Sequence, residues 1–168
     1  MTIRAARPDD ALPLTRAQVA GWKDTYRGPV RGAFLDQLTA DQWAPTHRRR
    51  IDDRESSHTY LVAELHGSVR GFVSFGPARL PEPSTSGEIY ALYVAPVVIG
   101  QGLGAALLHE AAGALRGRGY AVVMLWVMDG NERAVRFYER QGMQHRGARK
   151  HDVVDGVGEW DDLRYAFP

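Results

Sequence analysis

The pattern of hydrophobic and polar positions changes along the chain between the two-residue period of strands and the period of about 3.6 residues of helices. These changes predict the order of the strands and helices. Two-residue alternation and short apolar runs predict strands in residues 2–8, in 59–77 with a turn at His66–Gly67, and in 88–94, 121–127, 143–151 and 160–167. Helical periodicity and capping residues predict helices at 9–26, 32–38, 39–53, between Gly102 and Gly119, and at 132–141. A loop rich in Pro and Ser separates the strands over residues 77–87. The pattern predicts a single domain over residues 1–168.

Three glycines, Gly100, Gly102 and Gly104, occupy alternate positions between an apolar strand and the helix that follows it. Glycine loses more backbone freedom on folding than any other residue, so this arrangement is costly. One glycine is enough for a tight turn between a strand and a helix, which makes a purely structural role for all three the weaker interpretation. The stronger one is a site where bare backbone approaches a ligand.

Three kinds of ligand-binding loop contain closely spaced glycines. A Walker-type phosphate loop needs Lys and then Ser or Thr after its last glycine, and Ala-Ala-Leu follows Gly104, which excludes it. A dinucleotide fingerprint fits G-x-G-x-x-A from Gly100 to Ala105, with Asp129 after the next strand, but too few strands and helices remain for that fold. A pyrophosphate cradle fits best, because the backbone N–H groups at this helix N-terminus would point at phosphate oxygens.

The composition of the chain excludes several partners and kinds of chemistry for this site. The chain has 21 Lys and Arg against 20 Asp and Glu, so we expect neither nucleic acid nor a membrane as a partner. The absence of cysteine excludes disulfides, zinc–thiolate sites and cysteine nucleophiles, and no metal site is predicted. The charged first residues lack the apolar core of a signal peptide, and no run of about 18 apolar residues spans a bilayer. We therefore expect a cytoplasmic protein.

Two sequence blocks at a defined separation point to a known family. The stretch Ile99-Gly100-Gln101-Gly102-Leu103-Gly104 is similar to the motif Arg/Gln-x-x-Gly-x-Gly/Ala, and LWVMDGNERAVRFYERQGM carries Asn131, Tyr138 and Gly142 at the positions of a second conserved block. GEIYALYVAP and GWKDTYRGPVRGAFLDQL are similar to further segments. Together they resemble the GCN5-related N-acetyltransferases (GNAT). The chain departs from the motif at Ile99, where a polar contact to the cofactor is lost, so we expect lower cofactor affinity with an unaffected backbone cradle.

This resemblance implies an α/β fold of the GNAT type. Its central mixed, mostly antiparallel sheet has about seven strands, is flanked by helices, and has splayed fourth and fifth strands. Acetyl-CoA is the implied co-substrate, with its pantetheine arm in the gap between these strands. Of the implied contacts, the N–H of Val94 polarises the thioester carbonyl, and Asn131 orients pantetheine besides capping a helix. The implied cofactor-binding residues are Leu92, Tyr93, Val94, Ile99, Gly100, Gln101, Gly102, Leu103, Gly104, Ala105, Asn131, Phe137 and Tyr138.

Acetyl transfer to an amine needs a neutral amine and a proton for the leaving thiolate. The resemblance makes Tyr138 the candidate acid. A thiol has a pKa of about 8.5 and tyrosine about 10, so the proton transfer is feasible once the geometry is right. Simple packing beside Phe137 is the alternative. It makes Glu88, at the start of the fourth strand, the candidate base or the residue that orders a water chain, and a solvated strand-end carboxylate is the alternative. The rival bases are His58, His145 and His151.

The acceptor is the part that no motif identifies. Trp22 and Tyr26 lie four residues apart on one helix face and are either core residues or, as the resemblance implies, part of an acceptor pocket together with Glu88. The expected acceptor is a primary amine of a small molecule or peptide. Another acyl donor, an oxygen acceptor, a coenzyme A-binding sensor without turnover and, more distantly, a nicotinamide enzyme stay open. Dimers are common in the family, so a homodimer is expected.

Overall fold

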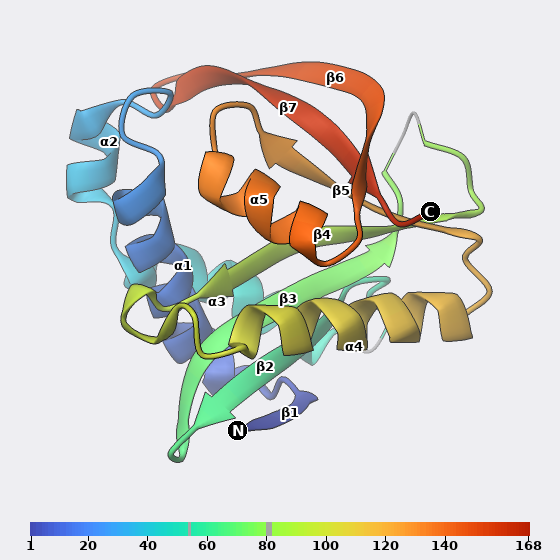
Figure 1. Cartoon of the computed structure of the whole chain (residues 1–168). Coiled ribbons are helices and arrows are strands. Elements are labelled where there is room, and N and C mark those ends of the chain that lie inside the picture. Colours follow the sequence, from blue (N-terminus) through green and yellow to red (C-terminus); the bar gives the residue numbers. More distant parts are fainter. Residues whose placement is uncertain (54, 80–81) are drawn as a thin grey trace.

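The computed structural model describes residues 1–53, 55–79 and 82–168 and is built around one seven-stranded sheet (Figure 1). Across the sheet the strands follow the order β1-β2-β3-β4-β5-β7-β6. The strands are β1 Thr2–Ala5, β2 Thr59–Leu65, β3 Ser68–Pro77, β4 Ser86–Val94, β5 Val122–Met128, β6 Gln144–Val154 and β7 Gly158–Ala166. The helices are α1 Ala11–Thr25, α2 Gly32–Gln37, α3 Ala40–Asp52, α4 Leu103–Gly117 and α5 Glu132–Arg140, with short 3-10 turns η1 Pro8–Asp10 and η2 Pro96–Val98.

The strand pairings confirm the predicted mixed, mostly antiparallel sheet. Neighbouring strands run antiparallel except β4 and β5, which run parallel. α4 forms the crossover that a parallel pair requires. At the end of the chain, β7 lies next to β5, and β6 forms the edge of the sheet. The final hairpin therefore turns back on itself, which puts its second strand beside the splayed part of the sheet.

The central strands β2 and β3 are buried on both faces. Val73 packs with Leu107 of α4 on one face, and Phe72 packs with Leu14 of α1 on the other. Figure 1 shows α4 in front of these strands and α3 behind them. Because each buried large apolar side chain contributes roughly 1.5–3 kcal/mol, this two-sided burial accounts for the near-continuous apolar run in β3.

The predicted element types are confirmed, and the differences lie at their ends. β4 begins at Ser86, and β6 continues to Val154 because it pairs along β7 as far as Gly158. The loop predicted over residues 77–87 shortens at both ends, and its residues 80 and 81 lie outside the described part of the chain. Within the described ranges, no helix has both the length and the apolar character needed to cross a bilayer.

His47 joins α3 to the sheet as a buried, neutral side chain. It is 7% exposed, and its Nδ1 lies 3.2 Å from the Tyr60 hydroxyl while its Nε2 lies 2.8 Å from Oε1 of Gln18. In the neutral tautomer that satisfies both contacts, Nε2–H donates to Gln18 and Nδ1 accepts from Tyr60. Burial, with a smaller effect of the Arg50 charge, lowers the pKa of His47 to about 4.

This histidine predicts a loss of stability in mild acid. The unfolded chain binds a proton at His47 near pH 6.5 and the folded chain only near pH 4, so stability rises with pH between these values and is fully present above them. At about 1.4 kcal/mol per pH unit, the free energy of unfolding should fall by up to about 3 kcal/mol over this window. Urea denaturation of the protein and of His47→Gln between pH 6.5 and 5 tests this. An unchanged slope in the variant would contradict it.

Candidate active site

The strands β4 and β5 separate halfway along their length. Their ladder covers only the pairs from Ser86–Val122 to Ile89–Leu125. A β-bulge lies at this point, because Ser74 and Phe75 of β3 pair with Ala91 and Ile89, which leaves Tyr90 as the extra residue of β4. Bulges bend a strand and redirect its side chains. The splay opens into a cavity of about 670 Å³ lined by both strands.

One edge of β4 is available to a ligand inside this cavity. The backbone N–H of Ala95 donates to the carbonyl of Arg70, so alternate residues before it also direct their backbone groups toward β3. By this alternation, Leu92 and Val94 direct their N–H and C=O groups into the gap. Both residues line the cavity. Buried backbone groups without partners are costly, so an extended ligand arm that pairs with this edge fits it.

The alternating glycines lie where the cavity meets the first turn of α4. Gly100 and Gly102 adopt left-handed backbone with φ of 87° and 84°, and an added Cβ at either would meet no atom within 4 Å. Backbone geometry therefore explains these two glycines and leaves the space beside them open. Gly104 has ordinary helical backbone. The N–H groups of the first turn have no partner within the helix, which makes this a site suited to an anion.

Three tyrosines gather beside the open edge of β4. Tyr26, Tyr93 and Tyr138 all line the cavity, and the indole N–H of Trp22 donates to the Tyr93 hydroxyl at 2.9 Å. Burial is the main cause that raises the pKa of each of the three hydroxyls above its ordinary value. Each hydroxyl therefore stays protonated at neutral and mildly alkaline pH and can donate a hydrogen bond to a developing anion.

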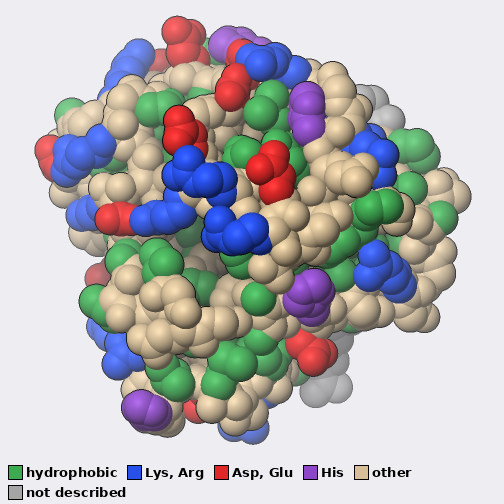
Figure 2. Space-filling model, viewed as in Figure 1, with side chains coloured by type: hydrophobic (Ala, Val, Ile, Leu, Met, Phe, Trp, Pro, Cys, Tyr) green, Lys and Arg blue, Asp and Glu red, His purple; other side chains and the backbone are tan. Residues whose placement is uncertain are grey.

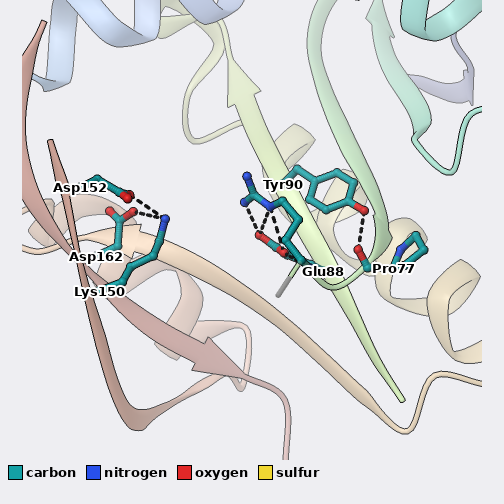
Figure 3. Close-up of polar contacts among 7 residues, drawn as sticks. Pro77, Glu88, Tyr90, Lys150, Asp152 and Asp162 are labelled. Carbon is teal, nitrogen blue, oxygen red and sulfur yellow. Dashed lines mark hydrogen bonds and ion pairs between the residues drawn. The ribbon is translucent and has the colours of Figure 1, made fainter. Parts of the chain in front are cut away.

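Glu88 is buried against Arg79. Its side chain is 1% exposed and does not line the cavity. The backbone N–H of Arg79 donates to Oε2 at 3.0 Å, Nε lies 3.1 and 3.2 Å from the two carboxylate oxygens, and Nη2 makes a further contact (Figure 3). The guanidinium and the amide of Arg79 therefore occupy both oxygens of this carboxylate. The base role and the acceptor contact of Glu88 stay predictions, and the structure places its side chain off the cavity wall.

A second charged cluster lies across the cavity on β6 and β7. Nζ of Lys150 lies 2.7 Å from Asp152 and 3.0 Å from Asp162, and 5.4 Å from the centre of the Trp126 ring (Figure 3). Burial raises the pKa of Asp162, against the opposing effect of Lys150 and with a further rise from Asp152. Among the described residues, these two aspartates are the carboxylates that line the cavity.

The structure brings most of the predicted site residues together. Gln101 and Glu88 lie off the cavity wall. The predicted residues on the wall are Trp22, Tyr26, Leu92, Tyr93, Val94, Ile99, Gly100, Gly102, Leu103, Gly104, Ala105, Asn131, Phe137 and Tyr138. Asn131 also caps α5 as predicted, by accepting from the N–H of Ala134 at 3.2 Å.

Sequence reasoning missed the charged residues of the wall. Asp162 lies two residues after Trp160 on β7, so the two side chains are on the same face of the strand. The sequence does not tell which face of β7 meets the cavity. Arg133 and Arg140 are seven residues apart, two helical turns, and this spacing was a usable signal that both lie on one face of α5.

Positive charge near the cradle comes from α5. Figure 2 shows basic and acidic side chains gathered over this helix, with few of them near the start of α4 below it. Ile99 itself is 46% exposed and lines the cavity. Arg140, from the last turn of α5, lines the same cavity and is exposed. Arg140 therefore places a cation on the wall of this cavity, although Ile99, at the motif position of a polar residue, is apolar.

Comparison with known proteins agrees with this geometry. The family described as the acetyltransferase (GNAT) family matches residues 22–143. The chain is 28% identical to YuaI, an uncharacterized N-acetyltransferase of Bacillus subtilis (strain 168), over 97% of this chain and 94% of that protein. It is 37% identical to a mycothiol acetyltransferase of Parafrankia sp. (strain EAN1pec), over 88% of this chain.

The chain spans 53% of the length of that mycothiol acetyltransferase, about half. Among solved structures, the paia N-acetyltransferase of Thermoplasma acidophilum, determined in complex with coenzyme A, has a TM-score of 0.76 at 19% identity. That match covers 99% of each chain and supports the fold.

Proposed function

Because this chain belongs to the GNAT family and is an acyltransferase, we propose that it transfers the acetyl group of acetyl-CoA to a primary amine. The observation that carries this proposal is the open edge of β4, Leu92 to Val94, leading to a bare cradle at the start of α4 within one cavity. The first feature suits the pantetheine arm and the second its pyrophosphate. The similar fold solved with coenzyme A supports the same donor.

The residues at the splay supply the chemistry of the transfer. After the ammonium has lost a first proton, the neutral amine nitrogen forms a bond to the thioester carbon, the carbon–sulfur bond breaks, and a second proton leaves the nitrogen. The N–H of Val94 stabilises the oxyanion that develops, and the Tyr138 hydroxyl donates to the departing sulfur. Since a tyrosine is a weaker acid than a thiol, this hydroxyl acts as a hydrogen-bond donor, and the proton lost by the amine balances the thiolate.

We assign the role of proton acceptor to Asp162 in place of Glu88. Its carboxylate lines the cavity, is 9% exposed, and has its pKa raised by burial, which makes it a better proton acceptor than an ordinary aspartate. Lys150 and Asp152 fix its position. An ammonium drawn to this acid pair would lose a proton to Asp162 first, and the neutral amine formed in this way then attacks.

Asp162→Asn keeps the shape of this residue and removes the proton acceptor. We expect kcat/KM to fall by about 10²-fold near pH 7 and the deficit to shrink at alkaline pH, where more of the acceptor is already neutral. In the parent enzyme, activity falls as pH drops toward the raised pKa of Asp162. The inflection at that pKa should be absent in the variant, whose rate should follow the neutral fraction of the amine.

Asp161→Asn is the matched control for this variant. Asp161 is the neighbouring residue, contacts Arg149 and His151, and does not line the cavity. A pH–rate profile of Asp162→Asn that matches the parent and this control would show that the proton leaves by another route.

Release of free thiol from acetyl-CoA across a panel of primary amines tests the proposed activity directly. Steady release that depends on one of the amines supports it. Binding of acetyl-CoA with no thiol release from any amine would favour a sensor, and release with a different acyl donor would redefine the donor. We further propose a single domain over residues 1–168, a cytoplasmic location and a homodimer, and size measurement in solution tests the last of these.

A further inference from the structure

Arg79 and Lys150 lie on facing parts of the cavity wall and differ in where their counter-ions lie. Lys150 pairs with two aspartates that line the cavity themselves, whereas the counter-ion of Arg79, like the Asp24 that pairs with Arg133 at 2.8 Å, lies off the wall. The partner of Arg79 is Glu88, which is buried off the cavity. The positive charge of Arg79 therefore faces the cavity with its neutralising charge behind it.

Glu88 also fixes the orientation of this guanidinium. The carboxylate contacts Nε and Nη2, and the backbone N–H of Arg79 donates to the same carboxylate. The ring of Tyr90 lies 5.2 Å from the guanidinium carbon. The Arg79 side chain is nevertheless 59% exposed. A planar donor group held by its inner edge, with the remainder facing the cavity, is prepared to bind a carboxylate.

The opposite wall carries the complementary charge. Asp152 and Asp162 line the same cavity as Arg79, so the two clusters face one volume. Figure 3 shows Lys150, Asp152 and Asp162 on one side and Glu88 on the other. A ligand between them meets carboxylates on one wall and a guanidinium on the other.

We propose that Arg79, held in place by Glu88, binds an anionic group of the acceptor, so that the acceptors are small amino acids or amino-acid-like amines that carry a carboxylate. The proposal rests on the acetyl transfer proposed above and names the substrate class of the same cavity. Glu88 is then a positioning residue, and Arg79 is the residue that selects the acceptor.

The test compares acceptors that differ only in the anionic group. Thiol release is measured with a set of amino acids, their carboxamides and aminoalkyl phosphates. With the parent enzyme, kcat/KM for the carboxylates should exceed that for the carboxamides at least about tenfold, because a charged hydrogen-bonded pair is lost in the amide. Arg79→Gln should erase this preference by raising KM for carboxylates, with KM for acetyl-CoA unchanged. Arg79→Lys should restore part of it.

Variants of Glu88 separate positioning from base catalysis. Glu88→Gln should raise KM for carboxylate acceptors with little change in kcat and in the pH profile. Because Arg79→Gln leaves a buried carboxylate without its partner, the double variant Arg79→Met with Glu88→Met removes both charges and keeps the interior satisfied. It should lack the preference and still acetylate carboxamides. Arg136→Met, an exposed arginine on α5 that pairs with Glu132, is the control.

The outcomes are distinct. Equal kcat/KM for carboxylates and carboxamides in the parent enzyme, or a preference for aminoalkyl phosphates over carboxylates, overturns the proposed acceptor class. A loss of kcat in Glu88→Gln that is the same for every acceptor also overturns it and returns the base role to Glu88. Acetyl-CoA binding without thiol release from any amine means instead that the proposed acetyl transfer has failed.

Discussion

Gly104→Asp is expected to abolish acetyl-CoA binding without lowering the stability of the protein. Gly104 lies in the first turn of α4 with helical backbone, so an aspartate fits there without backbone strain. Helix propensity and the helix dipole both favour Asp over Gly at this place, the dipole by about 0.3–1 kcal/mol. The same negative charge enters the position proposed for the pyrophosphate.

The expected loss of affinity follows from charge and from volume. Two unit charges about 4 Å apart repel by about 1 kcal/mol in water and about 4 kcal/mol near a protein surface. The side chain also blocks the backbone donors of the first turn. Since about 1.4 kcal/mol changes an affinity tenfold, acetyl-CoA should bind at least about 100-fold more weakly. Calorimetric titration measures the affinity, and thermal unfolding measures the stability.

Two variants of α4 make this result interpretable. Gly113→Asp puts the same charge on an exposed position of the same helix, where an added Cβ meets no atom within 4 Å, and should leave binding unchanged. Gly104→Ala adds only a Cβ, 3.4 Å from the Phe137 ring and 3.7 Å from Val94, and should weaken binding only slightly. An affinity of Gly104→Asp within threefold of the parent would remove the phosphate site from the start of α4.

Tyr138→Phe is expected to lower kcat by about 10²-fold or more while acetyl-CoA affinity stays within several-fold. The variant removes one hydroxyl and keeps the ring, which packs against Phe137 with ring centres 5.2 Å apart. No hydrogen bond of this hydroxyl is found among the described residues, so stability should change by less than about 1 kcal/mol. Steady-state kinetics at saturating acetyl-CoA measures the effect.

The neighbouring tyrosines provide the comparison for this variant. Tyr165→Phe removes a hydroxyl that lies 3.3 Å from Glu139 and off the cavity, and should leave kcat unchanged. Tyr26→Phe tests the other hydroxyl of the cluster. A larger loss of kcat in Tyr26→Phe than in Tyr138→Phe would assign the donor role to Tyr26. Normal rate and affinity in Tyr138→Phe would leave that side chain a packing role only.

The helices and strands could be predicted from the sequence because their signals, caps, turns and alternation, involve residues close together in the chain. Helix α5 begins after Asn131, whose side chain accepts from the backbone of Ala134, and such a cap depends only on residues next to one another. The strands of the β2–β3 hairpin follow from alternation and the turn at His66–Gly67. Strand order was accessible only through the resemblance, because pairing of β5 with β7 joins residues far apart in the chain.

The part of the cavity wall that we propose for the cofactor was predictable for a related reason. The cradle, the first turn of α4 and the open edge of β4 are continuous in the sequence from Leu92 to Ala105, so a motif can record them. Their interaction with a ligand uses backbone groups, which depend little on the residues that surround them.

What the sequence determined by itself is the set of elements and the glycine cradle, whose causes lie within a few residues. What only the tertiary structure decided is which charged side chains are buried, which partners they have and which of them line the cavity. Glu88 is a candidate catalytic carboxylate in the sequence, and only the structure shows Arg79 against it. Asp162 is one of two adjacent aspartates in the sequence, and the pairing of β7 with β5 brings it to the cavity. A carboxylate becomes a base or an anchor according to its burial and its partners, and both are set by segments distant in the chain.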